Sequence, residues 1–271
     1  MMGFHGYGYG FAIAVSGFKY TLRKQGSSII MAGMTENSNQ KLVALATELV
    51  EAAANKGITL RVMAGVAVYM TCSGIETHPS LQRELHDLDL SAAPKDFDAL
   101  AGLFSERGLR LTARDANRMA FEGDGAKIEV FAPDYRDSRR VDLGPRLAVS
   151  SPMLPLADLL LIKLQRSHFE EKDVRDSIAL LLDHRVGRGE GEDQIDREYI
   201  ARLGAGDWGL FTTTYDNLVK LEQELDRYLE PEEAQLVWRR IELLQEDMDR
   251  ERKSLGWMVN QVLRRPTQVP R

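Results

Sequence analysis

Two aspartates stand two positions apart in the segment His86-Asp87-Leu88-Asp89-Leu90. Polar and apolar residues alternate there, which is the pattern of a β-strand with one buried face. Because successive strand side chains point to opposite faces, we expect both carboxylates on the same face. Two carboxylates this close repel each other unless a cation lies between them, and hard cations such as Mg²⁺ prefer oxygen ligands. The pair therefore fits a site for Mg²⁺ (or Mn²⁺), and the alternative is a solvated acidic pair at a strand end.

A third carboxylate lies in the segment Lys127-Ile128-Glu129-Val130-Phe131, which has the same strand pattern. If this strand pairs beside the Asp87 strand, Glu129 joins the same face as the two aspartates. Three carboxylates can hold two metal ions. One ion would activate an attacking oxygen, and the other would neutralise phosphates and stabilise a leaving oxygen.

The first part of the chain alternates helices and strands. A helix is expected to begin near Ser38 and to end at Gly57. Apolar residues from Phe97 to Phe104 recur at helical spacing, which predicts another helix over 96–107. Two apolar runs around Gly123-Asp124-Gly125 are typical of a β-hairpin. The expected strands cover residues 58–63, 86–90, 118–121, 126–131 and 146–151, and a polar connection covers 71–85.

The chain changes character after Pro155, where helical periodicity dominates. We expect helices over 156–166, 170–184, 196–205, 212–229 and 231–264. The predicted fold class is α+β, a small mixed sheet with helices followed by an all-helical C-terminal region. The predicted organisation is a disordered leader over 1–37, an α/β core over 38–152 and a helical domain over 153–271.

The composition limits which partners and which cellular compartment the protein is expected to have. The 271 residues carry 35 basic and 41 acidic side chains, a net charge of −6, which disfavours an extended nucleic-acid footprint. A local basic rim remains open, from Arg83, Arg136, Arg139 and Arg140. The single cysteine, Cys72, excludes an internal disulfide framework, so we expect a reducing, cytoplasmic setting. No apolar run approaches the roughly 20 residues of a spanning helix, and no membrane partner is expected.

Together these segments resemble the polymerase-beta-like nucleotidyltransferases. Members of that family place a small-residue turn between a strand and a helix, then Asp-x-Asp on the next strand and a third acid on a later one. Here Met63-Ala64-Gly65-Val66 stands for the turn, and Asp87, Asp89 and Glu129 stand for the acids. The resemblance implies a nucleotidyltransferase core, Mg²⁺ bound by these acids, and a nucleoside triphosphate as substrate.

The helical part is similar to the bacterial branch that contains toxin-like and abortive-infection-type enzymes. The likeness lies in Leu154-Pro155-Leu156 through Lys163-Leu164-Gln165 and in Glu171-Lys172-Asp173-Val174-Arg175-Asp176. It implies that Lys163 and Asp173 face the active site, with Arg166 one turn further on. The triphosphate would then contact Ala64, Gly65, Arg83, Lys163 and Arg166. Without the resemblance, Lys163 would be expected to extend to solvent and residues 172–176 to form a solvated face.

Three departures from the family pattern leave an alternative open. Ala64 stands where glycine is usual, Glu129 replaces an aspartate, and Asp87 follows Gly65 by 22 positions, so residues 71–85 look like an insertion. The alternative is a catalytically silent, antitoxin-like interaction module, with residues 231–264 as a helix for a partner or a dimer. The acceptor stays open among transfer RNA, a protein side chain and a small molecule such as an aminoglycoside.

Overall fold

A five-stranded mixed sheet forms the first half of the computed structural model, which describes residues 38–123 and 125–263. Its strands lie in the order β1-β2-β5-β4-β3. β2 and β5 are parallel, and the other neighbours are antiparallel. The expected leader over 1–37 lies outside the described residues. The strands are β1 (Leu60–Met63), β2 (Asp87–Ala92), β3 (Arg110–Arg114), β4 (Arg118–Gly123) and β5 (Ala126–Phe131).

One face of this sheet is the apolar core. Leu88 and Leu90 of β2 and Ile128 and Val130 of β5 are fully buried, as the alternating sequence predicts. The helices α1 (Ser38–Asn55) and α4 (Phe97–Ser105) cover this face, and a short 3-10 helix, η1 (Pro94–Asp96), leads into α4. Phe104 of α4 packs edge-on against Phe121 of β4, with ring centroids 4.9 Å apart. The opposite face is left for the polar side chains of the same strands.

Glycines shape two of the turns that join these elements. Gly57 follows α1 with a φ of +73°, and Gly125 lies in the β4–β5 turn with a φ of +75°. Glycine adopts this left-handed conformation without steric cost. The expected helix stop and the expected hairpin are both confirmed. Between β1 and β2 the chain forms α2 (Ala64–Thr71) and α3 (Gly74–Thr77).

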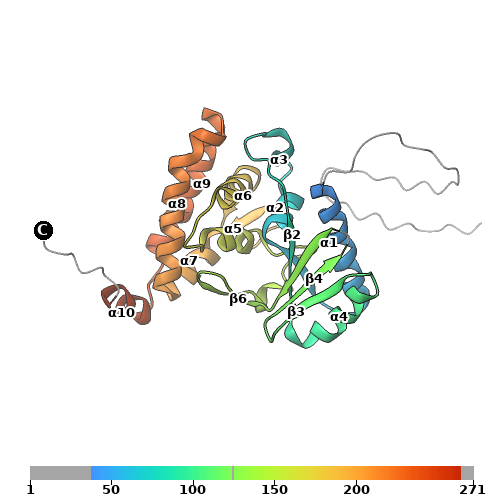
Figure 1. Ribbon diagram of the computed structural model, residues 1–271. Coiled ribbons are helices and arrows are strands. Elements are labelled where there is room, and N and C mark those ends of the chain that lie inside the picture. Colours follow the sequence, from blue (N-terminus) through green and yellow to red (C-terminus); the bar gives the residue numbers. More distant parts are fainter. Residues whose placement is uncertain (1–37, 124, 264–271) are drawn as a thin grey trace, which may run out of the picture. The chain divides into compact units, whose positions relative to one another are not determined.

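Helices dominate the second half, in agreement with the predicted fold class. α8 and α9 run side by side, and α10 lies at one end of α8 (Figure 1). Two short parallel strands, β8 (Arg185–Gly187) and β9 (Gln194–Asp196), interrupt the helices. None of the helices among residues 38–123 and 125–263 is long and apolar enough to cross a membrane. The helices are α5 (Leu156–Leu164), α6 (Glu171–Asp183), α7 (Arg197–Gly206), α8 (Trp208–Tyr228), α9 (Pro231–Arg250) and α10 (Leu255–Leu263).

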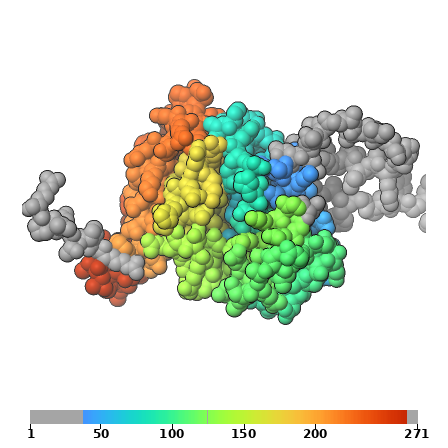
Figure 2. Space-filling model, in the orientation of Figure 1, coloured from blue at the N-terminus to red at the C-terminus, as the bar shows by residue number. Residues whose placement is uncertain are grey.

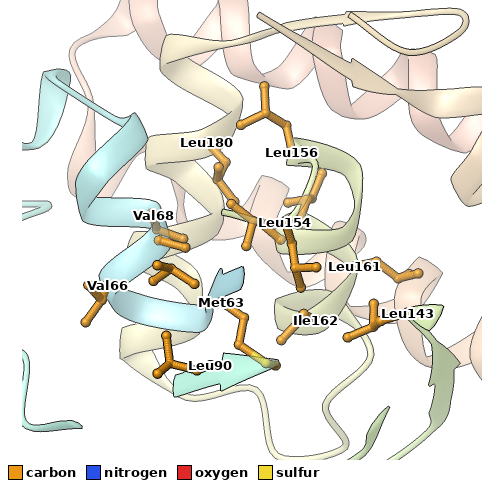
Figure 3. Packing of buried hydrophobic residues seen from close by; sticks show 14 of the residues in the cluster. Met63, Val66, Val68, Leu90, Leu143, Leu154, Leu156, Leu161, Ile162 and Leu180 are labelled. Atoms are coloured by element: carbon orange, nitrogen blue, oxygen red, sulfur yellow. The ribbon is translucent and has the colours of Figure 1, made fainter. Parts of the chain in front are cut away.

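Apolar packing between α2 and α5 joins the sheet to the helices. Val66 and Val68 of α2 lie across from Leu161 and Ile162 of α5, with Met63 near them (Figure 3). All five side chains belong to one continuous buried cluster that runs through both halves. Packing of this kind fixes the position of α5 relative to the end of β1, where the polar face of the sheet begins.

The structure corrects the strand expected over residues 146–151. That segment follows a 3-10 turn, η2 (Gly144–Arg146), and only Met153 forms an isolated bridge, to Val62 of β1. Pro145 and Pro152 bracket the segment and have no N–H to donate to a ladder. The exposed edge strand β3 and the small hairpin of β6 (Asp134–Arg136) and β7 (Arg140–Asp142) are additional elements. β3 alternates polar and apolar residues, but over only five positions that are all exposed, and β6 and β7 have three residues each, which is too short for a strand period to be recognised.

The single helix expected over 231–264 is also corrected, because it ends at Arg250 and α10 starts at Leu255. The Lys253 ammonium donates to the backbone carbonyls of Asp249 and Glu251, at 3.3 and 2.9 Å. The Ser254 hydroxyl accepts the backbone N–H of Trp257 at 3.1 Å. These bonds close the end of one helix and cap the start of the next.

A histidine joins the α3 connection to α9, and we predict that it makes stability depend on pH. His78 donates from Nε2 to Glu233 (2.9 Å) and from Nδ1 to the Gly74 carbonyl (2.8 Å), which requires the charged imidazolium. The bond to Glu233, then the bond to Gly74, raises the pKa of His78. The stabilisation is therefore full below the unfolded pKa of about 6.5 and is lost as pH rises through the higher folded pKa.

The measurement is denaturant unfolding of the wild type and of His78→Gln at about pH 6 and about pH 8.5. We expect His78→Gln to lower the free energy of unfolding by less than about 1 kcal/mol at the lower pH, because the pair is partly exposed, and by less at the higher pH. His168→Gln, at an exposed histidine, is the control. An equal effect of His78→Gln at both values would contradict the prediction.

Candidate active site

The three predicted acids lie together on the polar face of the sheet. Asp89 of β2 is directly paired with Glu129 of the parallel strand β5, and Asp87 is paired with Lys127. Since the strands are adjacent and alternation is kept, Asp87, Asp89 and Glu129 point to the same side. The condition set by the sequence, that the Glu129 strand lies beside the Asp87 strand, is confirmed.

These carboxylates create a local excess of negative charge. Burial raises the pKa of Asp89 to about 7, and the charges of Asp87 and Glu129 add to this shift. Lys163 and Arg166 act in the opposite direction. The two cations of the helical part are therefore close enough to the acids to influence them, and they do not fully compensate their charge.

A divalent cation fits this excess charge, because it would relieve the repulsion that raises the pKa of Asp89. Asp87 and Asp89 would provide the ligands. The carboxylate of Glu129 is occupied by an ion pair with Arg118 of β4. Among the described residues, no three His, Cys, Asp or Glu side chains stand ready-made as a metal-binding group. The arrangement fits a two-aspartate site better than the three-acid site expected from the sequence.

The turn between β1 and α2 lies next to Asp89, because Met63 at the end of β1 is paired with that residue. Ala64 has a φ of +54°, and within 38–123 and 125–263 no other non-glycine residue has a positive φ. Such a conformation costs about 1–2 kcal/mol for a residue with a Cβ. α2 starts here without a side-chain cap on its first amides. An uncapped helix start directs its N–H groups toward an anion.

Arg83 lies against this helix start. A methyl group added at Gly65 would collide with the Arg83 guanidinium, so the absence of a side chain at Gly65 makes room for it. A cavity of about 500 Å³ borders Arg83 on the side of Tyr69 and Glu76, and the three acids of the sheet do not line it. Arg83 thus stands between that cavity and the start of α2.

Lys163 of α5 is buried, with 4% of its side chain exposed, so the expectation of a lysine extending to solvent is wrong. Its ammonium lies 2.7 Å from Asp176 and 3.8 Å from Asp173, both on α6. Asp173 and Asp176 are buried as well, which also corrects the expectation of a solvated face for these two residues. A buried charge requires a partner of this kind.

Asp176 is the carboxylate on which two cations converge. Arg83 donates to it through Nε and Nη2, at 2.8 and 2.7 Å, in addition to the contact from Lys163. Burial by itself would raise the pKa of Asp176, but Lys163 and Arg83 outweigh burial and lower it. The residue is therefore a carboxylate that holds both cations in place.

Arg166 is held by a second set of acids. Its Nε lies 2.9 Å from Asp137, and its Nη1 lies 3.3 Å from Asp173. Asp173 also accepts the backbone N–H of Glu170 at 3.2 Å, as part of the capping box of α6. Burial raises the pKa of Asp173, against the effect of Lys163 and Arg166. The aspartate therefore positions Arg166 and also starts the helix.

Some predicted residues lie elsewhere, and three residues near the site were not predicted from the sequence to act there. Arg136 and Arg140 both pair with Asp134 on the β6–β7 hairpin, whereas Arg83 pairs with Asp176. Arg139 donates to Thr213 at 3.0 Å. The unpredicted residues are Asp176, Asp137 and Tyr135, the last with a pKa raised by burial and by the nearby charges of Asp137 and Asp89.

No protein-family model matches this chain, and a search of curated proteins finds no match. Solved structures with partial likeness include ANT(2'')-Ia in complex with adenylyl-2''-tobramycin, with a TM-score of 0.38, 12% identity, and coverage of 52% of this chain and 87% of that chain. A solution structure of the antibiotic-resistance factor ANT(2'')-Ia has a TM-score of 0.40 and 11% identity, with coverage of 70% of this chain and 100% of that chain. A crystal structure of an antigenic nucleotidyltransferase-like protein from Paracoccidioides brasiliensis has a TM-score of 0.43 and 16% identity, with coverage of 83% of this chain and 99% of that chain. At these TM-scores the function has to be argued from the site itself.

We predict that removing the charge of Asp176 destabilises the protein strongly. Asp176→Asn leaves Lys163 buried without its nearest carboxylate and weakens the hold on Arg83, so the free energy of unfolding should fall by about 3–5 kcal/mol. The measurement is denaturant unfolding followed by circular dichroism.

The matched control is Glu171→Gln on the same helix, whose exposed pair with Arg175 spans one turn at 2.8 Å. This substitution should leave the free energy of unfolding nearly unchanged, because exposed ion pairs contribute little. If the two variants lose the same small amount, the buried network does not stabilise the site.

Proposed function

We propose that this protein is a nucleotidyltransferase that moves a nucleoside monophosphate from a nucleoside triphosphate to an acceptor hydroxyl. The observation that carries the proposal is the pairing of Asp89 with Glu129 on one sheet face, beside Asp87 and within electrostatic reach of Lys163 and Arg166. Acids on one side and cations on the other match the needs of phosphoryl chemistry, in which a metal and fixed positive charges share the phosphates.

Asp87 and Asp89 would hold Mg²⁺ or Mn²⁺. A bound divalent cation supplies charge neutralisation for the phosphates and polarises the oxygens around phosphorus. The unshared negative charge near Asp89 supports this assignment, because it disfavours binding of a triphosphate unless a cation is present.

The protein's own positive groups would bind the triphosphate. The first amides of α2, at Ala64 and Gly65, lack a side-chain cap, and Arg83 lies against them. Lys163 and Arg166 lower the pKa of Asp89, so their charges act on the acids from the helical part. Each of these three cations is oriented by a carboxylate, so little conformational freedom would be lost when the phosphates bind.

In the proposed transfer, the acceptor oxygen forms a bond to the α-phosphorus while the bond from that phosphorus to the bridging oxygen breaks. The electron pair of the broken bond leaves with pyrophosphate. The hydroxyl proton passes to water, because the Glu129 carboxylate beside Asp89 is already held by Arg118. Fixed charges that stabilise the developing negative charge provide the rate enhancement.

The proposal also covers the branch of the family, the acceptor and the cellular compartment. Lys163 and the run Lys172-Asp173 are the residues that support membership of the toxin-like bacterial branch. The acceptor hydroxyl would belong to transfer RNA, a protein side chain or a small molecule. Triphosphates and Mg²⁺ are abundant in the cytoplasm, which is where such an enzyme would work.

We predict that nucleotide binding and transfer both require the aspartate pair. With Mg²⁺ and the preferred triphosphate at about 100 times its Kd, the melting temperature should rise by roughly 5–10 °C. The double variant Asp87→Asn, Asp89→Asn should lose this shift, and transfer of labelled nucleotide should fall by more than about 10²-fold. Its fold should survive, because the substitutions remove like charges that repel each other.

The control is Asp98→Asn, which removes an exposed aspartate of α4 that pairs with Arg114, and α4 is the helix that covers the apolar face of the sheet opposite the acids. It should keep the full thermal shift. A folded wild type that shows no metal-dependent shift with any of the four ribonucleoside triphosphates would instead favour a silent interaction module.

A further inference from the structure

The β6–β7 hairpin connects the sheet to the helical part beside Arg166. The Asp137 carboxylate in its turn lies 2.9 Å from the Arg166 Nε. The backbone N–H of Arg139 donates to the Gln165 side chain at 2.7 Å. Figure 2 shows this yellow-green segment at the surface between the green strands of the sheet and the orange helices. The hairpin therefore forms a wall of the candidate active site.

Tyr135 lies in the first strand of this hairpin, and its ring packs against the sheet. The ring stands edge-on to Phe131 of β5, with centroids 5.6 Å apart and an interplanar angle of 87°. Phe131 follows Glu129 by two positions in the same strand, so both side chains point to the polar face. The ring of Tyr135 is thus held on the sheet face that carries the acids.

The hydroxyl of Tyr135 lies among the charged groups of the site. Burial raises the pKa of Tyr135, and the charges of Asp137 and Asp89 add to this shift. Arg166 acts on Tyr135 in the opposite direction, and Tyr135 in turn acts on the pKa of Arg166. Within residues 38–123 and 125–263, no group forms a hydrogen bond with this hydroxyl, and it is not among the enclosed polar atoms. The hydroxyl is therefore a donor that is open to a ligand.

The chemistry of this donor favours an anionic ligand group. A phenol that keeps its proton can donate a hydrogen bond, and the strongest such bonds go to charged acceptors. Under the proposed function, a metal at Asp89 and the cationic Arg166 both draw phosphates to this place. A phosphate oxygen would then be the charged acceptor nearest to the Tyr135 hydroxyl.

We propose that Tyr135 is a substrate-binding residue whose hydroxyl donates a hydrogen bond to a phosphate oxygen of the nucleoside triphosphate. This inference rests on the proposed function, to which it adds a neutral, directed donor beside the charge of Arg166. The ion pair between Asp137 and Arg166 fixes the hairpin and the guanidinium together, so both donors are positioned before the triphosphate binds.

The test is Tyr135→Phe, which removes the hydroxyl and keeps the ring that packs on Phe131. The melting temperature without ligand should therefore stay unchanged. Isothermal titration calorimetry measures the binding of each ribonucleoside triphosphate, and of inorganic triphosphate, in the presence of Mg²⁺. We expect the variant to bind its preferred nucleotide about tenfold more weakly, because a hydrogen bond to a charged group is lost. Inorganic triphosphate, which has no ribose or base, should lose the same factor.

The matched control is Tyr215→Phe on α8, where the lost hydroxyl donates to Asp249 of α9 at 3.3 Å. It should bind nucleotide as the wild type does. If Tyr135→Phe also binds normally while the wild type needs Mg²⁺, this inference is wrong and the proposed function stands. A variant that binds the nucleotide weakly but inorganic triphosphate normally overturns it too, since the hydroxyl would then contact the ribose or base. A folded wild type that binds no triphosphate with Mg²⁺ overturns both.

Discussion

The burial of Lys163 is the constraint on which the candidate site depends. An ammonium with 4% of its side chain exposed can remain charged only if a carboxylate is held against it, and Asp176 lies 2.7 Å away. The same carboxylate binds Arg83, which lies on the uncapped start of α2. One buried aspartate therefore links α5, α6 and the connection before β2, and so fixes the cations of the helical part relative to the acids of the sheet.

The sequence predicts the elements of the sheet well, because each strand with one buried face repeats its apolar residues at every second position. That period alone assigns Asp87 and Asp89 to one face, and the observed pairing of β2 with β5 adds Glu129 to it. The period is present in β3, but it covers only five exposed residues with no buried face, and the three-residue strands of the β6–β7 hairpin are too short to show it. Tyr135 and Asp137 belong to this hairpin segment, so their proximity to Arg166 could not be inferred.

The sequence predicted which residues belong to the site better than which carboxylate pairs with which cation. Asp173 and Asp176 are one turn apart on α6, and either could face Lys163 until the packing of α5 against α6 is known. The structure gives the shorter contact to Asp176 and leaves Asp173 to Arg166 and to the capping box. Glu129 is a similar case, since its ion pair with Arg118 depends on the register of β4 against β5. Choices of this kind depend on docking and register, which the spacing of residues in one segment does not encode.

Two segments depart from the usual conformational and packing preferences of proteins, the turn at Ala64 and the helix α10. Ala64 occupies a left-handed conformation that glycine would adopt at no cost, beside the strand end that carries Asp89. A residue with a Cβ has fewer alternative conformations than glycine, so the strained turn is also a rigid one, and rigidity keeps the first amides of α2 directed at one place. α10 turns its apolar side outward and its tryptophan inward, which reverses the usual arrangement of a surface helix. Natural sequences depart from such rules mainly where function compensates the loss of stability, so the strained turn points to the start of α2 as a place where binding occurs.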